Sequence, residues 1–259
     1  MANRMPVLFI GHGSPMNAVQ RNRYTEAWSV IGVEVPRPSA VLCVSAHWYI
    51  PGAALTVNAA PRTIHDFGGF PPELYRVQYP APGDPRLARR VRKLLSPLTV
   101  ELAETWGLDH GAWSVLKHVY PRADVPVVQL SIDETQAARF HYEIGQRLAP
   151  LREENVLIVG SGNLVHNLHA YAWGRHAAEP YEWALRFERR ARQLLMAGEY
   201  ASLVGYQNLE RDALLSVPTP DHYLPLLYVS GAAMEGDPVA FPVEGIDGGS
   251  ISMLAVRIG

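Results

Sequence analysis

The chain has 259 residues, of which 48% are hydrophobic and 19% charged, and its formal net charge is −2. This composition is typical of a globular protein with a full-sized core. The small net charge argues against nucleic acid or an anionic membrane as the main partner. Cys43 is the only cysteine, so we expect a buried free thiol and a reducing, cytoplasmic environment. We find no apolar run with the length of a transmembrane helix or of a signal-peptide core.

Strand-like and helix-like patterns alternate along the chain. Short apolar runs predict strands at residues 7–10, 40–48, 54–57, 98–102, 126–132, 156–159, 239–243 and 250–258. Helical spacing predicts helices at 16–31, 84–95, 140–148 and 180–197, and one more after residue 113. Asp84 before Pro85 is typical of a helix start, and Asp221 before Pro225 predicts another capped helix. The alternation predicts a single α/β domain over residues 1–259, with a central, mainly parallel or mixed sheet flanked by helices.

Three of the predicted strands end near a histidine. His12 follows the first strand, His47 lies at the end of the second, and His166 comes a few residues after the strand at 156–159. The carboxyl ends of parallel strands meet at one edge of a sheet, where such sheets usually bind ligands. A lone histidine in a turn is about as often an ordinary hydrogen-bonding group as a functional residue. The recurrence predicts one shared site at this edge.

Five histidines occupy turns or strand ends: His12, His47, His110, His166 and His222. Histidine is the commonest metal ligand and the usual acid or base near neutral pH. No His-Glu-x-x-His pair is present, so a metal site must be assembled from distant segments. We expect surface or helix-face roles for His118, His141, His169 and His176. The glycine-rich turn at 11–13 lacks the third glycine of a dinucleotide fingerprint.

Six short motifs then occur in order: residues 11–17 (GHGSPMN), 45–48 (SAHW), 63–71 (TIHDFGGFP), 109–111 (DHG), 160–168 (GSGNLVHNL) and 218–223 (PTPDHY). Together they resemble the class III, LigB-type extradiol ring-cleaving dioxygenases, specifically the 4,5-DOPA dioxygenase subfamily. The resemblance spans essentially the whole chain.

This resemblance implies a non-haem Fe(II) site at the carboxyl edge of the sheet. By position, His12, His47 and His222 match metal ligands. His166 matches the acid–base catalyst beside the metal, and can be a fourth ligand when zinc occupies the site. His110 matches a histidine that either supports the ligands from behind or faces the substrate, and we expect it to be catalytic. His65 and Asp66 fall on the subfamily's characteristic loop, and we expect them to bind substrate.

The implied reaction is the 4,5-cleavage of a catechol such as L-DOPA, with both atoms of O2 entering a ring-opened semialdehyde. Ground-state O2 is a triplet and a catechol is a singlet, so their direct reaction is slow. A redox-active iron that binds both reactants overcomes this barrier. Zinc fills the same ligands without redox chemistry, so we expect a zinc-loaded protein to be inactive.

Several alternatives remain open from the sequence. Asp221 adjoins His222 and could complete a facial triad of two histidines and a carboxylate, although we favour His222. A non-catalytic metal-binding or scaffold relative would share the same motifs. A class II tetrapyrrole chelatase shares the Gly-His-Gly-Ser turn but does not explain residues 45–48, 63–71 or 219–223. A zinc hydrolase would need a glutamate base, and none accompanies the histidines.

Overall fold

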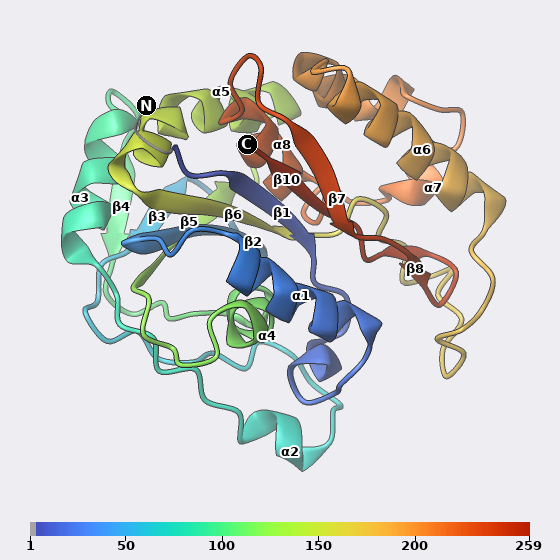
Figure 1. Ribbon diagram of the computed structural model, residues 1–259, viewed down its shortest axis with the longest axis horizontal. Coiled ribbons are helices and arrows are strands. Elements are labelled where there is room, and N and C mark those ends of the chain that lie inside the picture. The colour runs from blue at the N-terminus through green and yellow to red at the C-terminus, as the bar shows by residue number, and fades with distance from the viewer. Residues whose placement is uncertain (1–3) are drawn as a thin grey trace.

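The computed structural model describes residues 4–259 and contains one large mixed sheet (Figure 1). Eight strands form it in the order β4-β3-β5-β2-β6-β1-β10-β7. Their bounds are β1 Val7–Gly11, β2 Ala40–Ile50, β3 Ala53–Thr56, β4 Val100–Ala103, β5 Val127–Asp133, β6 Val156–Gly162, β7 Val239–Val243 and β10 Ala255–Ile258. A small separate hairpin pairs β8 (Ile246–Asp247) with β9 (Ile251–Ser252). The predicted α/β class is confirmed.

The four central strands run parallel, and this arrangement aligns their carboxyl ends. β2 pairs with both β5 and β6, and β6 pairs with β1, all in parallel. β10 and β7 extend the sheet antiparallel on one side, and β3 joins β5 antiparallel on the other. In register, Gly11 lies opposite Gly162, and Ser45 lies opposite Ser161. The segments that follow β1, β2 and β6 therefore emerge side by side.

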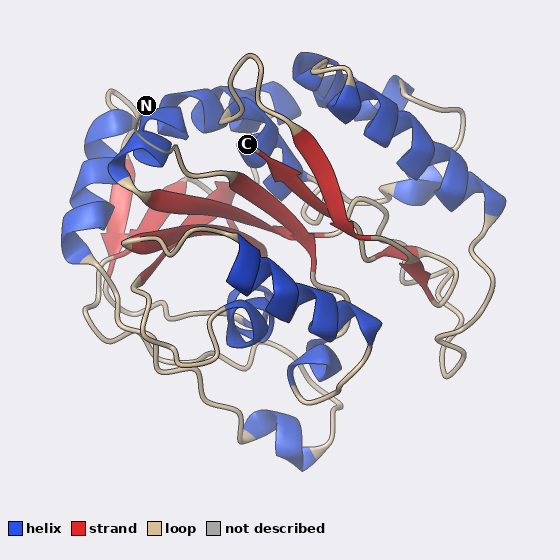
Figure 2. Ribbon diagram, viewed as in Figure 1, coloured by secondary structure: helices blue, strands red, loops and turns tan. Residues whose placement is uncertain are grey.

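Helices cover both faces of the sheet, which explains why its central strands are buried along almost their whole length (Figure 2). α1 (Arg23–Glu34) and α4 (His110–Val119) pack on one face. Four helices pack on the other face: α3 (Pro85–Leu94), α5 (Ala138–Leu148), α6 (Glu182–Met196) and α8 (Leu224–Gly231). Shorter helices are α2 (Pro72–Tyr75) and α7 (Ala213–Ser216), with 3-10 turns at Pro15–Ala18, Ala149–Glu154 and Tyr200–Asn208.

The predicted helix starts have two different outcomes. Asp84 caps α3 as expected, accepting hydrogen bonds from the backbone N–H groups of Arg86 at 2.9 Å and Leu87 at 3.0 Å. The prediction that Asp221 caps α8 is wrong. That helix begins after Tyr223 without a side-chain cap, because the Asp221 carboxylate bonds the His222 ring instead.

Several element boundaries shift by one to three residues, and the strand predicted over 250–258 is two strands, β9 and β10. Two further elements differ from the prediction. The single helix expected over 16–31 is a 3-10 turn followed by α1, because Asn22 caps a new helix by accepting from Tyr24 and Thr25. β2 does not end at His47 but continues to Ile50, with an irregular register between Val44 and Tyr49. This irregularity lets a strand residue turn its side chain toward the edge of the sheet.

The predictions for Cys43, for two helix histidines and for membrane spans can also be compared with the structure. Cys43 is a buried free thiol in β2, as predicted. His118 lies on α4 and donates to the carbonyl of Asn17 at 2.8 Å. His141 is not on the surface: it is fully buried on α5, with Nδ1 2.9 Å from the Tyr228 hydroxyl. Within residues 4–259, no helix combines the length and hydrophobicity that crossing a membrane requires.

Candidate metal centre

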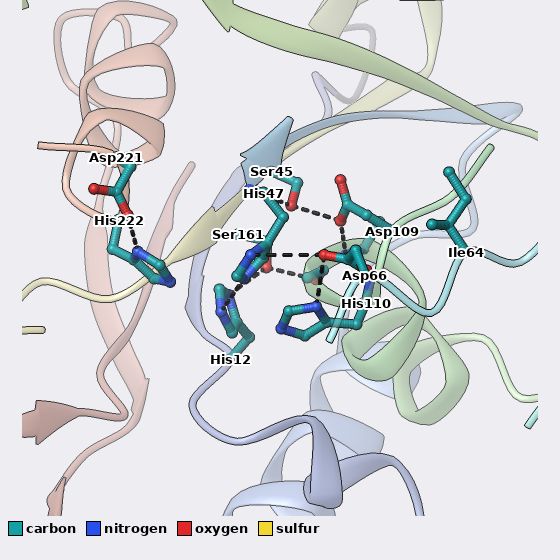
Figure 3. Close-up of polar contacts among 12 residues, drawn as sticks. His12, Ser45, His47, Ile64, Asp66, Asp109, His110, Ser161, Asp221 and His222 are labelled. Carbon is teal, nitrogen blue, oxygen red and sulfur yellow. Dashed lines mark hydrogen bonds and ion pairs between the residues drawn. The ribbon is translucent and has the colours of Figure 1, made fainter. Parts of the chain in front are cut away.

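Three histidines from distant parts of the chain meet at the carboxyl edge of the sheet (Figure 3). His12 follows β1, His47 lies near the end of β2, and His222 precedes α8. One ring nitrogen of each lies within 4.8 Å of those of the other two. The Nε2 atoms of His12 and His47 are only 3.0 Å apart. The parallel register described above produces this convergence.

Two glycines allow the segments to approach so closely. A Cβ atom on Gly162 would lie 2.1 Å from the carbonyl oxygen of His222, so the end of β6 can carry only glycine there. A Cβ atom on Gly111 would lie 2.4 Å from Ser45 Oγ and 2.8 Å from a carbon of the His47 ring. Both glycines lie in the sequence motifs. Gly162 leaves room for the segment that carries His222, and Gly111 leaves room for the ring of His47.

Ser161 determines which nitrogen of His12 carries the proton. The Ser161 hydroxyl donates to the carbonyl of Gly111 at 2.6 Å, so its oxygen acts as the acceptor toward His12 Nδ1 at 3.0 Å. His12 therefore carries its proton on Nδ1, and the lone pair is on Nε2. Such an outer partner typically orients a metal-binding histidine.

Asp221 plays the same part for His222. Its carboxylate accepts a hydrogen bond from His222 Nδ1, which leaves the lone pair on Nε2. Burial alone would raise the pKa of Asp221, but the hydrogen bond from His222 holds it well below its ordinary value. The ring of His166 stacks on that of His222 with centroids 3.5 Å apart and planes 5° from parallel. Because Asp221 bonds Nδ1 of His222, it lies on the opposite side of that ring from the free Nε2 atom.

Burial keeps His12, His47 and His166 neutral. It lowers the pKa of both His12 and His47 well below the ordinary value, and the neighbouring imidazoles lower it further. Burial and the adjacent His222 lower the pKa of His166 to about 2. Neutral imidazole is the form that binds metal ions.

The spacing of the nitrogens suits a divalent metal ion. Two nitrogen ligands about 2.1 Å from one ion, at right angles to each other, are about 3.0 Å apart. The Nε2 atoms of His12 and His47 have that separation. Two further groups could also hold an ion: His47, Asp66 and His110, and His166, Asp221 and His222. All three groups adjoin, so the cluster as a whole fits a metal centre.

The loop at residues 63–71 brings Asp66 to this cluster but not His65. Asp66 accepts two hydrogen bonds from His110, one from its backbone N–H and one from Nδ1, each 2.8 Å long. Burial would raise the pKa of Asp66, yet these bonds lower it below its ordinary value. His65 instead donates from Nε2 to the carbonyl of Val77 at 3.0 Å. His65 therefore holds the loop rather than facing the histidine cluster.

A buried polar network behind the cluster was not foreseen from the sequence. Asp109 is fully buried and accepts hydrogen bonds from Ser45 Oγ at 2.7 Å and from the Gln129 amide. It also caps α4 through the backbone N–H of Ala112 at 3.1 Å. Burial raises the pKa of Asp109 to about 6. Asp109 and Ser161 both lie inside recognised motifs, but only the fold brings them to their partners.

Comparison with known proteins identifies the arrangement. The family model described as the catalytic LigB subunit of aromatic ring-opening dioxygenase matches residues 7–247. The chain belongs to the LigB family. LigB dioxygenases are metal-dependent, in keeping with the histidine cluster. The family predicted from the six motifs is confirmed, and with it an enzyme of the extradiol ring-cleaving dioxygenase class.

Individual LigB relatives match the chain along its full length. A protein of Escherichia coli K12 named 4,5-DOPA dioxygenase extradiol is 51% identical, with 100% of this chain and 96% of that protein covered. A Beta vulgaris protein of the same name is 36% identical, with 96% and 95% covered. A crystal structure described as an uncharacterized protein of Escherichia coli K12 superimposes with a TM-score of 0.86 at 45% identity, covering 99% of this chain and 100% of that one.

Proposed function

We propose that residues 1–259 form one catalytic domain that opens the ring of a catechol such as L-DOPA by 4,5-extradiol cleavage. In this proposal the site uses Fe(II), both atoms of O2 enter the product, and the product is a ring-opened semialdehyde. The observation that carries the proposal is the 3.0 Å approach of two histidine Nε2 atoms, His12 and His47, beside His222. The names of the two relatives support the substrate class.

His12, His47 and His222 are the residues we propose to hold the metal. Bound there, Fe(II) would supply a Lewis acid and also a redox partner for O2. Zinc in the same place would supply the Lewis acid but not the redox chemistry. Three neutral imidazoles leave the charge of a divalent ion uncompensated, which favours an anionic catecholate. His222 is the better third ligand than Asp221, because the carboxylate of Asp221 already accepts the Nδ1 proton of His222.

His166 is the proposed acid–base residue. Its ring stacks on His222 and is therefore held next to the ligand cluster. A group in this place can take a proton from a catechol hydroxyl and return one later, as general acid–base catalysis requires. His166 is also the candidate for a fourth ligand when zinc is bound.

In this proposal the catechol ring binds beside the loop at residues 63–71, which carries His65 and Asp66. The Phe67 side chain of this loop lies edge-on to His110, with ring centroids 5.5 Å apart. Phe67 also packs against Phe70 and Tyr75. An aromatic wall of this kind suits a flat aromatic substrate. His110 lies between that wall and His12, where it can contact a bound ring.

The test is oxygen consumption by protein reconstituted with Fe(II) under anaerobic conditions and then given L-DOPA and O2. We expect iron-dependent uptake of O2, with one equivalent of a yellow semialdehyde formed per O2 consumed. A zinc-loaded sample is the control and should take up none. Absence of uptake with L-DOPA and with simpler catechols, at full iron occupancy, would contradict the proposal and favour a non-catalytic relative.

A further inference from the structure

Asp66 uses both of its carboxylate oxygens on a single residue. Oδ1 accepts the backbone N–H of His110, and Oδ2 accepts Nδ1–H of the same histidine, each at 2.8 Å. The Asp66 side chain is mostly shielded, with 15% of its surface exposed, and that of His110 with 6%. A carboxylate that faces two donors on one residue fixes both the position and the rotation of that residue.

The segment that carries Asp66 is itself firmly attached. The backbone N–H of Ile64 donates to the carbonyl of Leu108 at 2.7 Å, and the indole of Trp113 donates to the carbonyl of Ile64 at 2.7 Å. Two exposed glycines follow, Gly68 and Gly69, where a Cβ atom would meet nothing within 4 Å. The loop is therefore tied to α4 up to Asp66, and its backbone is uncrowded at Gly68 and Gly69.

Capping of α4 does not by itself account for this contact. Asp109 already occupies the N-cap position and accepts from Ala112. Asp66 adds a bond to the imidazole ring, which a helix cap does not need. The ring of Phe67 packs edge-on against the same imidazole, so the orientation of His110 is fixed from two directions by one loop.

We propose that Asp66 is a positioning residue that holds His110 as its Nδ1–H tautomer, so that Nε2 presents a lone pair to the catechol. This inference rests on the proposed function for the identity of the substrate, but not for the tautomer. Since a carboxylate only accepts, the nitrogen that it contacts must carry the proton. The other ring nitrogen of His110 lies on the side of the ring that faces His12 (Figure 3). It then accepts a hydrogen bond from a substrate hydroxyl.

Asp66 also lies close to a proposed metal ligand. Its Oδ2 atom is 3.7 Å from Nδ1 of His47, too far for a hydrogen bond but near enough for electrostatic attraction to an Nδ1–H group. The rings of His47 and His110 lie against each other with centroids 3.8 Å apart. One loop carboxylate therefore faces the outer nitrogens of both histidines, and it connects the loop at residues 63–71 to the metal centre.

The Asp66→Asn variant provides a sharp test. The amide has one acceptor and one donor where the carboxylate has two acceptors. The backbone N–H of His110 can only donate, so the amide oxygen stays with it and the amide NH2 group faces the ring. His110 must then give up the proton on Nδ1 and carry it on Nε2, the wrong tautomer for accepting a bond from substrate. Asp66→Ala removes the acceptor altogether.

The direct readout is the tautomer of His110, observed by long-range proton–nitrogen NMR on zinc-loaded protein with 15N-labelled histidine. A His110→Gln variant assigns the resonance. We expect the Nδ1–H form in the wild type and the Nε2–H form in Asp66→Asn and Asp66→Ala. Persistence of the Nδ1–H form in both variants would overturn the proposal. Because no substrate is present, this result is independent of whether the iron enzyme cleaves L-DOPA.

Kinetics of the iron-loaded enzyme separate positioning from direct substrate contact. We expect Asp66→Asn to lower kcat on the order of 10–100-fold, with a much smaller change in the KM for L-DOPA. Glu73→Gln is the matched control, since it removes one negative charge from an exposed residue on nearby α2, and both constants should stay at wild-type values. A large rise in KM with unchanged kcat would assign Asp66 to substrate binding instead.

Discussion

His12 and His141 are both buried histidines, with 1% and 0% of their surface exposed, yet their surroundings differ. His12 donates a hydrogen bond from Nδ1 to the Ser161 hydroxyl. Its Nε2 atom faces Nε2 of His47, which lies on another strand. His141 pairs with Tyr228, and its Nε2 has no hydrogen-bond partner within residues 4–259. Burial therefore does not distinguish a ligand from a core histidine. The distinguishing feature is the convergence of free nitrogens from separate segments on one point.

The largest expected effect separates these two histidine environments directly. His47→Gln should lower the affinity for Fe(II) by more than about 100-fold and abolish oxygen uptake, because it removes one of three converging nitrogens. His141→Gln should bind iron like the wild type, since that residue faces no other ligand. Metal titration with a competing chromogenic chelator measures both. Unchanged affinity in His47→Gln would mean that the metal binds elsewhere. Equal losses in the two variants would point to misfolding, which circular dichroism detects.

His166 tests the division between ligands and acid–base residues within the cluster. His166→Gln should keep its iron while turnover falls by about 10²–10⁴-fold, because only proton transfer is lost. Iron content by mass spectrometry and initial rates of oxygen uptake give the two values. If iron is lost in step with activity, His166 is chiefly a ligand.

Ser161→Ala is expected to have a smaller effect, because Ser161 contacts His12, a proposed metal ligand, and would not contact the metal itself. Ser161→Ala removes the acceptor that fixes the Nδ1–H tautomer of His12. Affinity for the metal should fall by about 10–100-fold, with the fold intact. Ser29→Ala, at an exposed position of α1, offers the same chemical change away from the site. Identical affinities for Ser161→Ala and the wild type would show that His12 needs no outer partner.

The smallest effect concerns the pH dependence of stability through His141. Burial lowers the pKa of His141 to about 4 in the folded protein, against 6.5 when exposed. Between these values the unfolded chain takes up a proton that the folded chain does not. The free energy of unfolding should therefore fall as the pH drops from about 6.5 to 4, by up to about 3 kcal/mol from this residue.

His141→Gln should remove this contribution, so its stability should decline less with acidification than that of the wild type. Urea unfolding at several pH values between 7 and 4.5, on metal-free protein, measures the difference in slope. Parallel curves for the two proteins would show that His141 takes up its proton without unfolding.

The sequence predicted the parts of the site that depend on local pattern. Apolar runs located β1, β2 and β6, and the shared edge of a parallel sheet explained why His12 and His47 should meet. Asp84 identified the start of α3, since its capping bonds are local. Asp221 misled the same reasoning, because a carboxylate next to His222 could bond either the helix or the ring, and only the tertiary position of the ring decides.

Contacts that depend on the order of the strands or on loop packing could not be predicted from the sequence. Ser161 meets His12 because β6 lies next to β1, and Asp66 meets His110 because the loop at residues 63–71 is tied to the start of α4. Neither pairing has a characteristic spacing in the chain. The insertion of β10 and β7 beside β1, and the passage of β2 beyond His47, are likewise results of tertiary packing.

The most direct test of the metal centre is an anomalous difference map from crystals of the iron-loaded protein, recorded at the iron absorption edge. We predict a single peak bound by the Nε2 atoms of His12, His47 and His222, with Asp66 and Asp221 facing the outer nitrogens of the histidines. A peak coordinated by either carboxylate in place of one of these histidines, or no peak at this edge of the sheet, would contradict the account.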